Sequence, residues 1–235
     1  MRCIPTVRRR HRHVSPAPSR RLGAWIVTVT LLAPLGACGS GGTSDLTRRR
    51  LDIPSIASLD GTVRSDGEVT AQGGEPKVGD LASNQEVRML LSFSLEDVPA
   101  GAEITSALLR LRTTRVTGEP LLMDPLLIER VDIGTALDGT DFSSLALSSA
   151  TNVTMNGLLV TREIEVTTLV QQDVNELRTR TDLRLRLFGG TDGDLRDDWF
   201  GFETGDNEYR TGERAELSVT YETTPLDGSI AWRDN

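Results

Sequence analysis

The chain has 235 residues, of which 34 are acidic and 26 are basic, giving a formal net charge of −8. This length suits one or two domains, and a single large β-domain of this size is ordinary. The acidic excess argues against nucleic acid as a partner, because a phosphate backbone carries charge of the same sign.

Residues 1–37 have the organisation of a secretory signal peptide: arginines, then a short apolar run at 24–35, then small residues. The run is too short to cross a bilayer, which takes a helix of about 20 residues. Leu35, Gly36, Ala37 and Cys38 resemble the bacterial lipobox. This predicts cleavage before Cys38 and a lipid on its sulfur that anchors the protein to a membrane. The alternative is an ordinary signal peptide with Cys38 present by chance.

Cleavage at this point would change the chemistry available to the chain. The leader holds seven arginines and no acidic residue, so 19 basic and 34 acidic residues would remain, a net charge of −15. Both histidines, His11 and His13, would be lost, and Cys38 would be the only cysteine. Nucleophilic catalysis that depends on imidazole, and most zinc sites, would then be excluded. Carboxylate pairs remain, but no pair stands out, and the prediction is that the protein is not an enzyme.

Residues 38–55 are small, polar and basic, which predicts a flexible tether. A β-domain is expected over 56–224, followed by a C-terminal tail at 225–235. Short extended pieces at 58–80 are separated by Asp-Gly and Gly-Gly turns. Alternate apolar residues then predict a strand, with one face formed by Val87, Met89, Leu91, Phe93 and Leu95.

Pro99 and Gly101 end this strand, and Ala107, Leu109 and Leu111 mark an apolar face on the next one, so 88–113 is predicted to be a β-hairpin. Helical spacing of Leu169, Val170, Asp173, Val174 and Leu177 predicts one short helix. Residues 132–157 are predicted to form a long irregular connection or a weak hairpin. Further strands are expected at 125–131, 162–167, 182–188, 198–203 and 215–221. Many short strands with one short helix predict an all-β fold, an antiparallel β-sandwich of the jelly-roll kind.

A motif in the first third of this domain carries a family resemblance. An Asp-Gly-x-Val-Arg start is followed by a Val-Gly turn, an Arg-x-Leu-Leu-x-Phe-x-Leu strand, and a Pro-x-Gly turn before an Ile-x-Ser-Ala-x-Leu-x-Leu strand. The chain supplies this pattern with Asp60, Gly61, Val63, Arg64, Val78, Gly79, Arg88, Leu90, Leu91, Phe93, Leu95, Pro99, Gly101, Ile104, Ser106, Ala107, Leu109 and Leu111.

It resembles the DNRLRE-type β-sandwich family, which is similar to carbohydrate-binding module family ninety-six. The resemblance covers about 59–222 and is loose at 132–157. It implies an extracellular jelly-roll domain and, for some relatives, polysaccharide binding. The motif residues are core and turn positions, so the resemblance names no binding residue.

The first candidate site is the segment 191–209, which combines aromatic and acidic residues. Trp199 and Tyr209 could form a sugar platform, with Asp197 and Asp198 accepting hydrogen bonds from hydroxyls. The spacing of Asp192 and Asp194 suggests a calcium loop, so a structural calcium ion is the one cofactor considered. The alternative is that the aromatic residues fill the core, with Phe200 and Phe202 on one face and Trp199 on the other, while the acids are merely exposed.

The second candidate site is a ladder of arginines that includes Arg184 and Arg186. If these strands were neighbours, the guanidinium groups could bind the uronic acids of an anionic polysaccharide. The other members of the ladder would be Arg110, Arg112, Arg178 and Arg180. The favoured alternative is pairing with carboxylates on adjacent strands, among them Glu129, Glu163 and Glu165.

Two functions follow from these patterns. The first is a lipid-anchored bacterial envelope protein, in the outer membrane if the host is Gram-negative because Gly39 follows the cysteine, whose sandwich binds polysaccharide. The second is a structural or protein-interaction module of a surface assembly without a glycan ligand.

Overall fold

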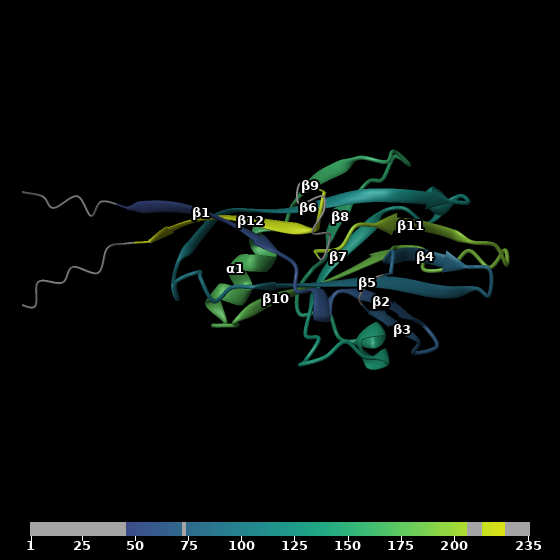
Figure 1. The fold of residues 1–235 in the computed structure, drawn as a ribbon, viewed down its shortest axis with the longest axis horizontal. Coiled ribbons are helices and arrows are strands. Elements are labelled where there is room, and N and C mark those ends of the chain that lie inside the picture. Colours follow the sequence, from purple (N-terminus) through teal and green to yellow (C-terminus); the bar gives the residue numbers. More distant parts are fainter. Residues whose placement is uncertain (1–45, 72–73, 206–212, 224–235) are drawn as a thin grey trace, which may run out of the picture. The chain divides into compact units, whose positions relative to one another are not determined.

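The computed structural model describes residues 46–71, 74–205 and 213–223. The predicted signal peptide with Cys38, the C-terminal tail and Tyr209 lie outside this part of the chain. The described residues form an antiparallel β-sandwich with one short α-helix, as the alternation of apolar residues predicted (Figure 1). No helix in the described ranges is both long enough and apolar enough to cross a bilayer.

Two sheets pack face to face. The first contains β1 (Thr47–Pro54), β12 (Glu216–Thr223), the start of β6 (Glu103–Thr117) and β9 (Thr161–Glu165). The second contains β8 (Thr151–Val153), β7 (Leu126–Val131), β10 (Arg180–Leu187), β5 (Gln85–Ser94), β2 (Gly61–Arg64), β3 (Val69–Ala71), β4 (Lys77–Leu81) and β11 (Asp198–Phe202). The end of β6 pairs with β11, so this long strand passes from the first sheet into the second.

The segment predicted as a hairpin is not one. β5 pairs with β10, β2 and β4, whereas β6 pairs with β12, β9 and β11, so the turn at 95–102 carries the chain from one sheet to the other. Gly101 adopts a φ of +75° in this turn, as its glycine predicted. Alternation correctly placed one face of each strand in the core. It does not distinguish two strands that are neighbours in one sheet from two strands that face each other across a sandwich.

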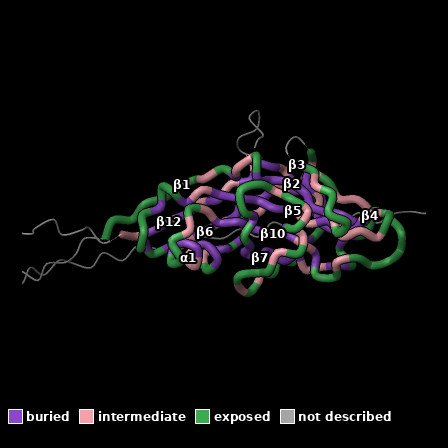
Figure 2. Tube along the Cα trace, turned by 90° about the horizontal axis from the view of Figure 1, so that it is seen from below, coloured by how far each residue is buried: buried purple, intermediate pink, exposed green. Residues whose placement is uncertain are grey.

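The core lies between the sheets and is drawn from every second residue of the strands. Phe93 and Leu109 come from opposite sheets and are both fully buried. Phe200 and Phe202 belong to the same core, and the centroids of their two rings are 6.4 Å apart. Buried segments follow the strands and exposed segments follow the connections (Figure 2). Leu90, which interrupts the polar face of β5, packs in a second small cluster with Val63, Val131 and Ile133 on the other side of its sheet.

The predicted tether at 38–55 is wrong at 47–54, where the chain forms strand β1, and its first part, 38–45, lies outside the described residues. β1 pairs with β12 over eight residues, from Thr47↔Thr223 to Pro54↔Glu216. This is an edge strand whose residues are mostly exposed, and only Leu51 and Ile53 pack against the core. Its sequence therefore has the polarity of a linker although its backbone completes a sheet.

The short helix is confirmed as α1 (Thr167–Asn175), which buries Leu169, Val170, Asp173 and Val174. Leu177 lies beyond its end in a left-handed conformation, φ +58°, and is exposed, contrary to the predicted spacing. The connection 132–157 contains only the short 3-10 helix η3 (Gly139–Ser143) and β8. A second 3-10 helix, η2 (Pro120–Met123), follows β6, and a third, η1 (Ala57–Leu59), precedes β2.

Candidate functional site

The predicted aromatic platform is buried. Trp199 is only 5% exposed, because β11 runs between β4 and β6 and neighbouring side chains cover the indole. Lys77 Nζ lies 4.3 Å from its ring centroid and the Arg115 guanidinium carbon 5.9 Å. Trp199 lies outside the main core that holds Phe200 and Phe202, so the alternating faces of β11 were predicted correctly. It cannot serve as an open surface for a sugar ring.

The predicted arginine ladder is mostly neutralised by carboxylates, which confirms the favoured alternative for Arg184 and Arg186. Arg184 is buried, and its Nε and Nη2 donate to Glu129 Oε2 at 2.9 and 2.7 Å. Its Nη1 donates to the backbone oxygens of Phe142 and Ser144, at 3.1 and 2.7 Å. Arg184 therefore holds the connection 132–157 against β10 and is not available to a ligand.

Arg186 donates from Nε to the other oxygen of Glu129, at 3.0 Å. Burial alone would raise the pKa of Glu129, but hydrogen bonds and charge from Arg184 and Arg186 outweigh it and lower that pKa. The Arg186 side chain remains one-quarter exposed, so its outer end is accessible to solvent.

A groove of about 320 Å³ lies beside Arg186 on the outer face of β7, β8 and β10. Phe188 follows β10 and is 68% exposed, and its backbone N–H donates to Pro125 O at 2.9 Å, which fixes the start of the loop. Asn152 stands exposed on β8, opposite Leu127 of β7. The groove is lined by Pro125, Leu127, Glu129, Ala150, Asn152, Arg186 and Phe188. It combines an aromatic ring, an amide and a guanidinium group on one surface.

The predicted calcium residues come together with two further aspartates at the other end of the second sheet. One carboxylate oxygen each of Asp192, Asp194 and Asp198 lie within 4.8 Å of one another. Asp80 on β4 is directly opposite Asp198 on β11 and accepts a hydrogen bond from the backbone N–H of Asp192, at 3.2 Å. Burial, and then the negative charges of Asp192 and Asp198, raise the pKa of Asp80.

Asp197, predicted as a sugar ligand, accepts a hydrogen bond from the backbone N–H of Ala82 at 3.0 Å. This bond and that from the Leu195 N–H to Asn84 Oδ1, at 3.0 Å, attach the β10–β11 loop to the turn after β4. Gly79 permits the close approach of β4 and β11 beneath this loop, since a Cβ at this position would lie 2.2 Å from Asp198 O. The Val-Gly pair of the family motif is therefore a strand position and not a turn.

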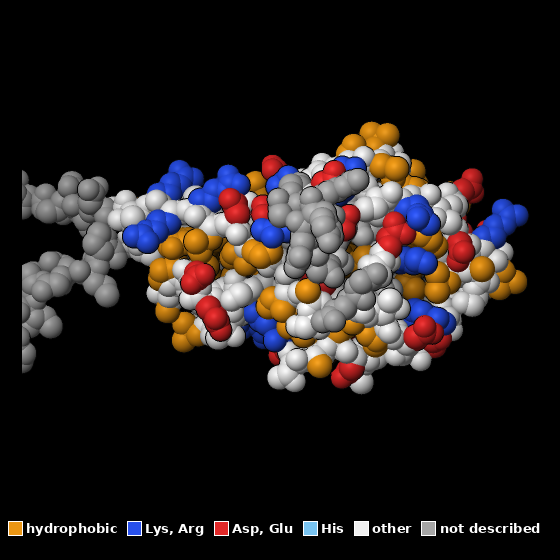
Figure 3. Space-filling model, viewed as in Figure 1, with side chains coloured by type: hydrophobic (Ala, Val, Ile, Leu, Met, Phe, Trp, Pro, Cys, Tyr) orange, Lys and Arg blue, Asp and Glu red, His pale blue; other side chains and the backbone are white. Residues whose placement is uncertain are grey.

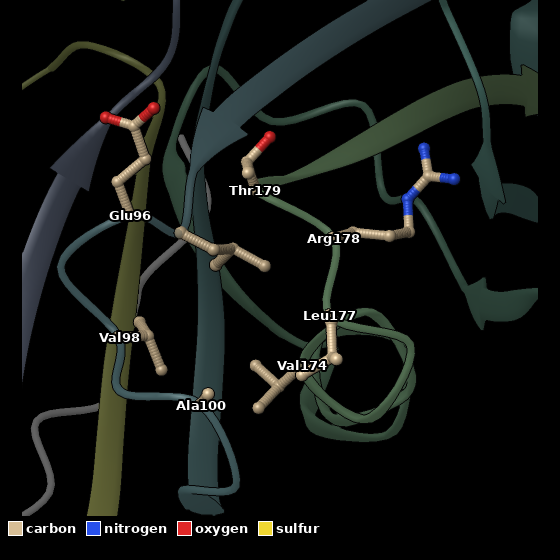
Figure 4. Close-up of a pocket in the computed structure, with 8 residues that line it drawn as sticks. Glu96, Val98, Ala100, Val174, Leu177, Arg178 and Thr179 are labelled. Atoms are coloured by element: carbon tan, nitrogen blue, oxygen red, sulfur yellow. The ribbon is translucent and has the colours of Figure 1, made fainter.

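A shallow hollow of about 260 Å³ lies between the β5–β6 turn and the end of α1 (Figure 4). Val98, Ala100 and Val174 form an apolar wall, while Arg178 is turned away from them. Arg178 is engaged by Asp173, Asp132 and Asp182. The hollow has no aromatic residue and few polar groups, so it suits a sugar less well than the Phe188 groove.

Exposed aliphatic side chains gather around the loop before β9 (Figure 3). Leu121 and Leu122 on η2 belong to this patch, and Leu121 Cδ1 would lie 3.7 Å from a Cβ at Gly157. The other members are Leu158, Leu159 and Val160. We call these five residues the leucine patch.

Reasoning from the sequence missed Phe188, Asn152 and Asp80 as site residues. Phe188 was assigned to a strand, although the double glycine after it was a signal that β10 ends there and leaves the ring at its margin. Asp80 carried no signal of its own, because Asp192 lies 112 residues away along the chain. Comparison with family models and with curated protein sequences finds no match.

Proposed function

We propose that the protein is a lipid-anchored bacterial envelope protein whose β-sandwich binds polysaccharide without catalysis. The observation that carries this proposal is the groove in which Phe188, Arg186 and Asn152 share one accessible surface. An aromatic face packs against the C–H face of a sugar ring, and the amide and guanidinium groups donate hydrogen bonds to its hydroxyls.

The charges in the groove favour a neutral polysaccharide. Of the groove-lining residues, only Glu129 and Arg186 are charged, one negative and one positive, so the surface offers hydrogen-bonding groups with little net charge. Arg186 donates to Glu129 through Nε, so its two terminal nitrogens remain for a ligand in the groove that this partly exposed side chain lines. A few placed polar groups around an apolar surface are typical of small-ligand sites.

Affinity electrophoresis of the purified protein through gels that contain neutral or uronic polysaccharides tests this proposal. We expect retardation by a neutral polysaccharide and a loss of affinity of about tenfold, or about 1.4 kcal/mol, in Phe188→Ala. Leu145→Ala is the matched control, because Leu145 is 85% exposed and is not one of the groove-lining residues. Absence of retardation by every polysaccharide, or equal retardation of Phe188→Ala, would contradict the proposal.

The anchor rests on the lipobox-like residues before Cys38 and is tested separately. Cells that express the protein and receive an alkyne fatty acid should label the wild type and not Cys38→Ser. Label retained by Cys38→Ser would contradict lipidation at this sulfur. The outer membrane is the proposed location in a Gram-negative host, and fractionation of labelled membranes checks it.

The leucine patch favours a second candidate function, an interaction module within a surface assembly. Exposed apolar residues that lie together on a surface are typical of protein-contact sites. A photo-crosslinking residue at Leu159 in living cells would then give a defined protein adduct, whereas one at Leu145 would not. An adduct at Leu159 combined with no retardation by polysaccharide would favour this function over glycan binding.

A further inference from the structure

The aspartate cluster at the junction of β4 and β11 contains buried oxygens that no protein group satisfies. Asp80 is fully buried and Asp198 is 3% exposed. Asp80 Oδ2 accepts the Asp192 N–H, but its Oδ1 is buried without a hydrogen-bond partner. Asp198 Oδ1 accepts the backbone N–H of Glu119, while its Oδ2 is likewise buried without a partner. Two buried carboxylate oxygens thus lack any donor.

The buried carboxylates of the cluster also lack a positive counter-charge among the described residues. Within the described ranges, neither Asp80, Asp192 nor Asp198 forms an ion pair with an arginine or lysine. Asp194 alone lies near one, 3.8 Å from Arg196, which is itself 80% exposed. An ionised buried carboxylate without a counter-charge is strongly destabilising, so a cation bound among these oxygens would stabilise the arrangement.

We propose that Asp80, Asp192, Asp194 and Asp198 bind one calcium ion. Calcium takes six to eight oxygen ligands, including carboxylates, backbone carbonyls and water. Asp192, Asp194 and Asp198 offer oxygen only, as does the adjoining Asp80, and no histidine or cysteine of the described ranges belongs to the cluster, which disfavours zinc and other transition metals. The sequence pattern suggested only Asp192 and Asp194, both exposed; the buried ligands Asp80 and Asp198 come from strands.

The ion fastens the β10–β11 loop to the sheet. Asp192 and Asp194 lie in that loop, whereas Asp80 and Asp198 lie on β4 and β11. The loop begins with Phe188, so a bound ion also fixes the segment that follows the groove. The calcium site is independent of the proposed glycan binding, since its ligands are none of the groove-lining residues.

Calcium titration of the chelator-treated full chain tests this inference, by calorimetry and by thermal unfolding. We expect one site per chain and a melting temperature that rises by about 5 °C or more at a concentration about a hundredfold above the Kd. Magnesium should give a smaller rise, because it demands octahedral geometry and retains water. Hydrogen exchange of the amides at 191–197 should slow when calcium is added.

Asp198→Asn tests the buried ligand, since an amide oxygen can still accept the Glu119 N–H while the charge is removed. We expect its calcium affinity to fall at least about tenfold. Asp194→Asn tests the exposed side of the site without touching the buried pair. Asp97→Asn is the matched control, because Asp97 is exposed in the turn beyond the opposite end of β5.

Full calcium affinity in both Asp198→Asn and Asp194→Asn would overturn the proposal. So would a wild type that neither binds calcium nor gains thermal stability in about 10 mM calcium, well above the weakest Kd of extracellular calcium sites. Equal responses to magnesium and calcium would overturn the choice of ion. Loss of polysaccharide binding has no bearing on these results, which are read from calcium binding and unfolding alone.

Discussion

The second sheet contains two groups of buried charged residues that differ in how their charge is balanced. At one end of the sheet, Glu129 is surrounded by Arg184 and Arg186, and each of its oxygens accepts hydrogen bonds from an arginine. At the β4–β11 junction, Asp80 and Asp198 face other carboxylates and each retains an oxygen without a partner. The carboxylates of both groups are buried, but only in the first group do protein atoms supply a hydrogen bond to every carboxylate oxygen.

This difference distinguishes buried charges that stabilise the fold from buried charges that we expect to bind a ligand. A buried ion pair whose hydrogen bonds are satisfied holds strands and loops in place and gives no reason to expect a ligand. A buried carboxylate pair of like charge is unfavourable by itself and becomes favourable when a cation binds. The exposed end of Arg186, beside Glu129, is the group that we propose donates hydrogen bonds to a neutral glycan.

Removal of the balancing carboxylate should produce the largest effect. Glu129→Gln leaves Arg184 buried without a counter-charge, and we expect the free energy of unfolding to fall by about 3–5 kcal/mol. Urea unfolding measures it. Glu103→Gln is the matched control, because Glu103 is exposed at the start of β6. A loss below about 1 kcal/mol in Glu129→Gln would show that the pair contributes little.

Acid should remove part of the stability that the ion pairs of Glu129 contribute. Because the folded pKa of Glu129 is lowered, the pair stabilises the fold above the unfolded value of 4.5, and that stability is lost as pH falls through the folded pKa. The difference in unfolding free energy between wild type and Glu129→Gln should therefore shrink as pH falls below 4.5. Urea unfolding at several pH values checks this, and a difference that grows in acid would reverse the sign.

Removing a charge from the aspartate cluster at the β4–β11 junction should have the opposite effect and raise the free energy of unfolding. In a chelator, Asp80→Asn removes one buried negative charge and keeps an acceptor for the Asp192 N–H. We expect the free energy of unfolding to rise by about 1 kcal/mol, or the melting temperature by about 2–4 °C. Thermal unfolding measures this, with Asp97→Asn expected to leave stability unchanged. A destabilised Asp80→Asn without cation would mean that the carboxylate already has a partner.

The strands and the helix could be predicted because each has an apolar face with a regular period. The pairing of the strands could not be predicted. Phe93 and Leu109 would be buried to the same extent whether their strands were neighbours in one sheet or lay in the two opposing sheets. β1 was missed because most of its residues are polar and exposed, and only Leu51 and Ile53 indicated a face toward the core.

The candidate sites were predicted less well than the fold. Whether an aromatic residue is exposed depends on which strands flank it: Trp199 lies between two strands and beneath Lys77, whereas Phe188 lies just past the end of its strand. The local pair Asp192 and Asp194 could be read from spacing. Asp80 could not, because strand register alone places it opposite Asp198.

The central functional proposal is tested most directly by mapping the bound glycan on the isotope-labelled protein by NMR. An oligosaccharide from a polysaccharide that retards the protein is titrated in, and amide shifts are followed. Our account predicts saturable shifts at Leu127, Asn152, Arg186 and Phe188, on three neighbouring strands and the loop start. Shifts confined to the leucine patch, or no shift at the groove, would contradict it.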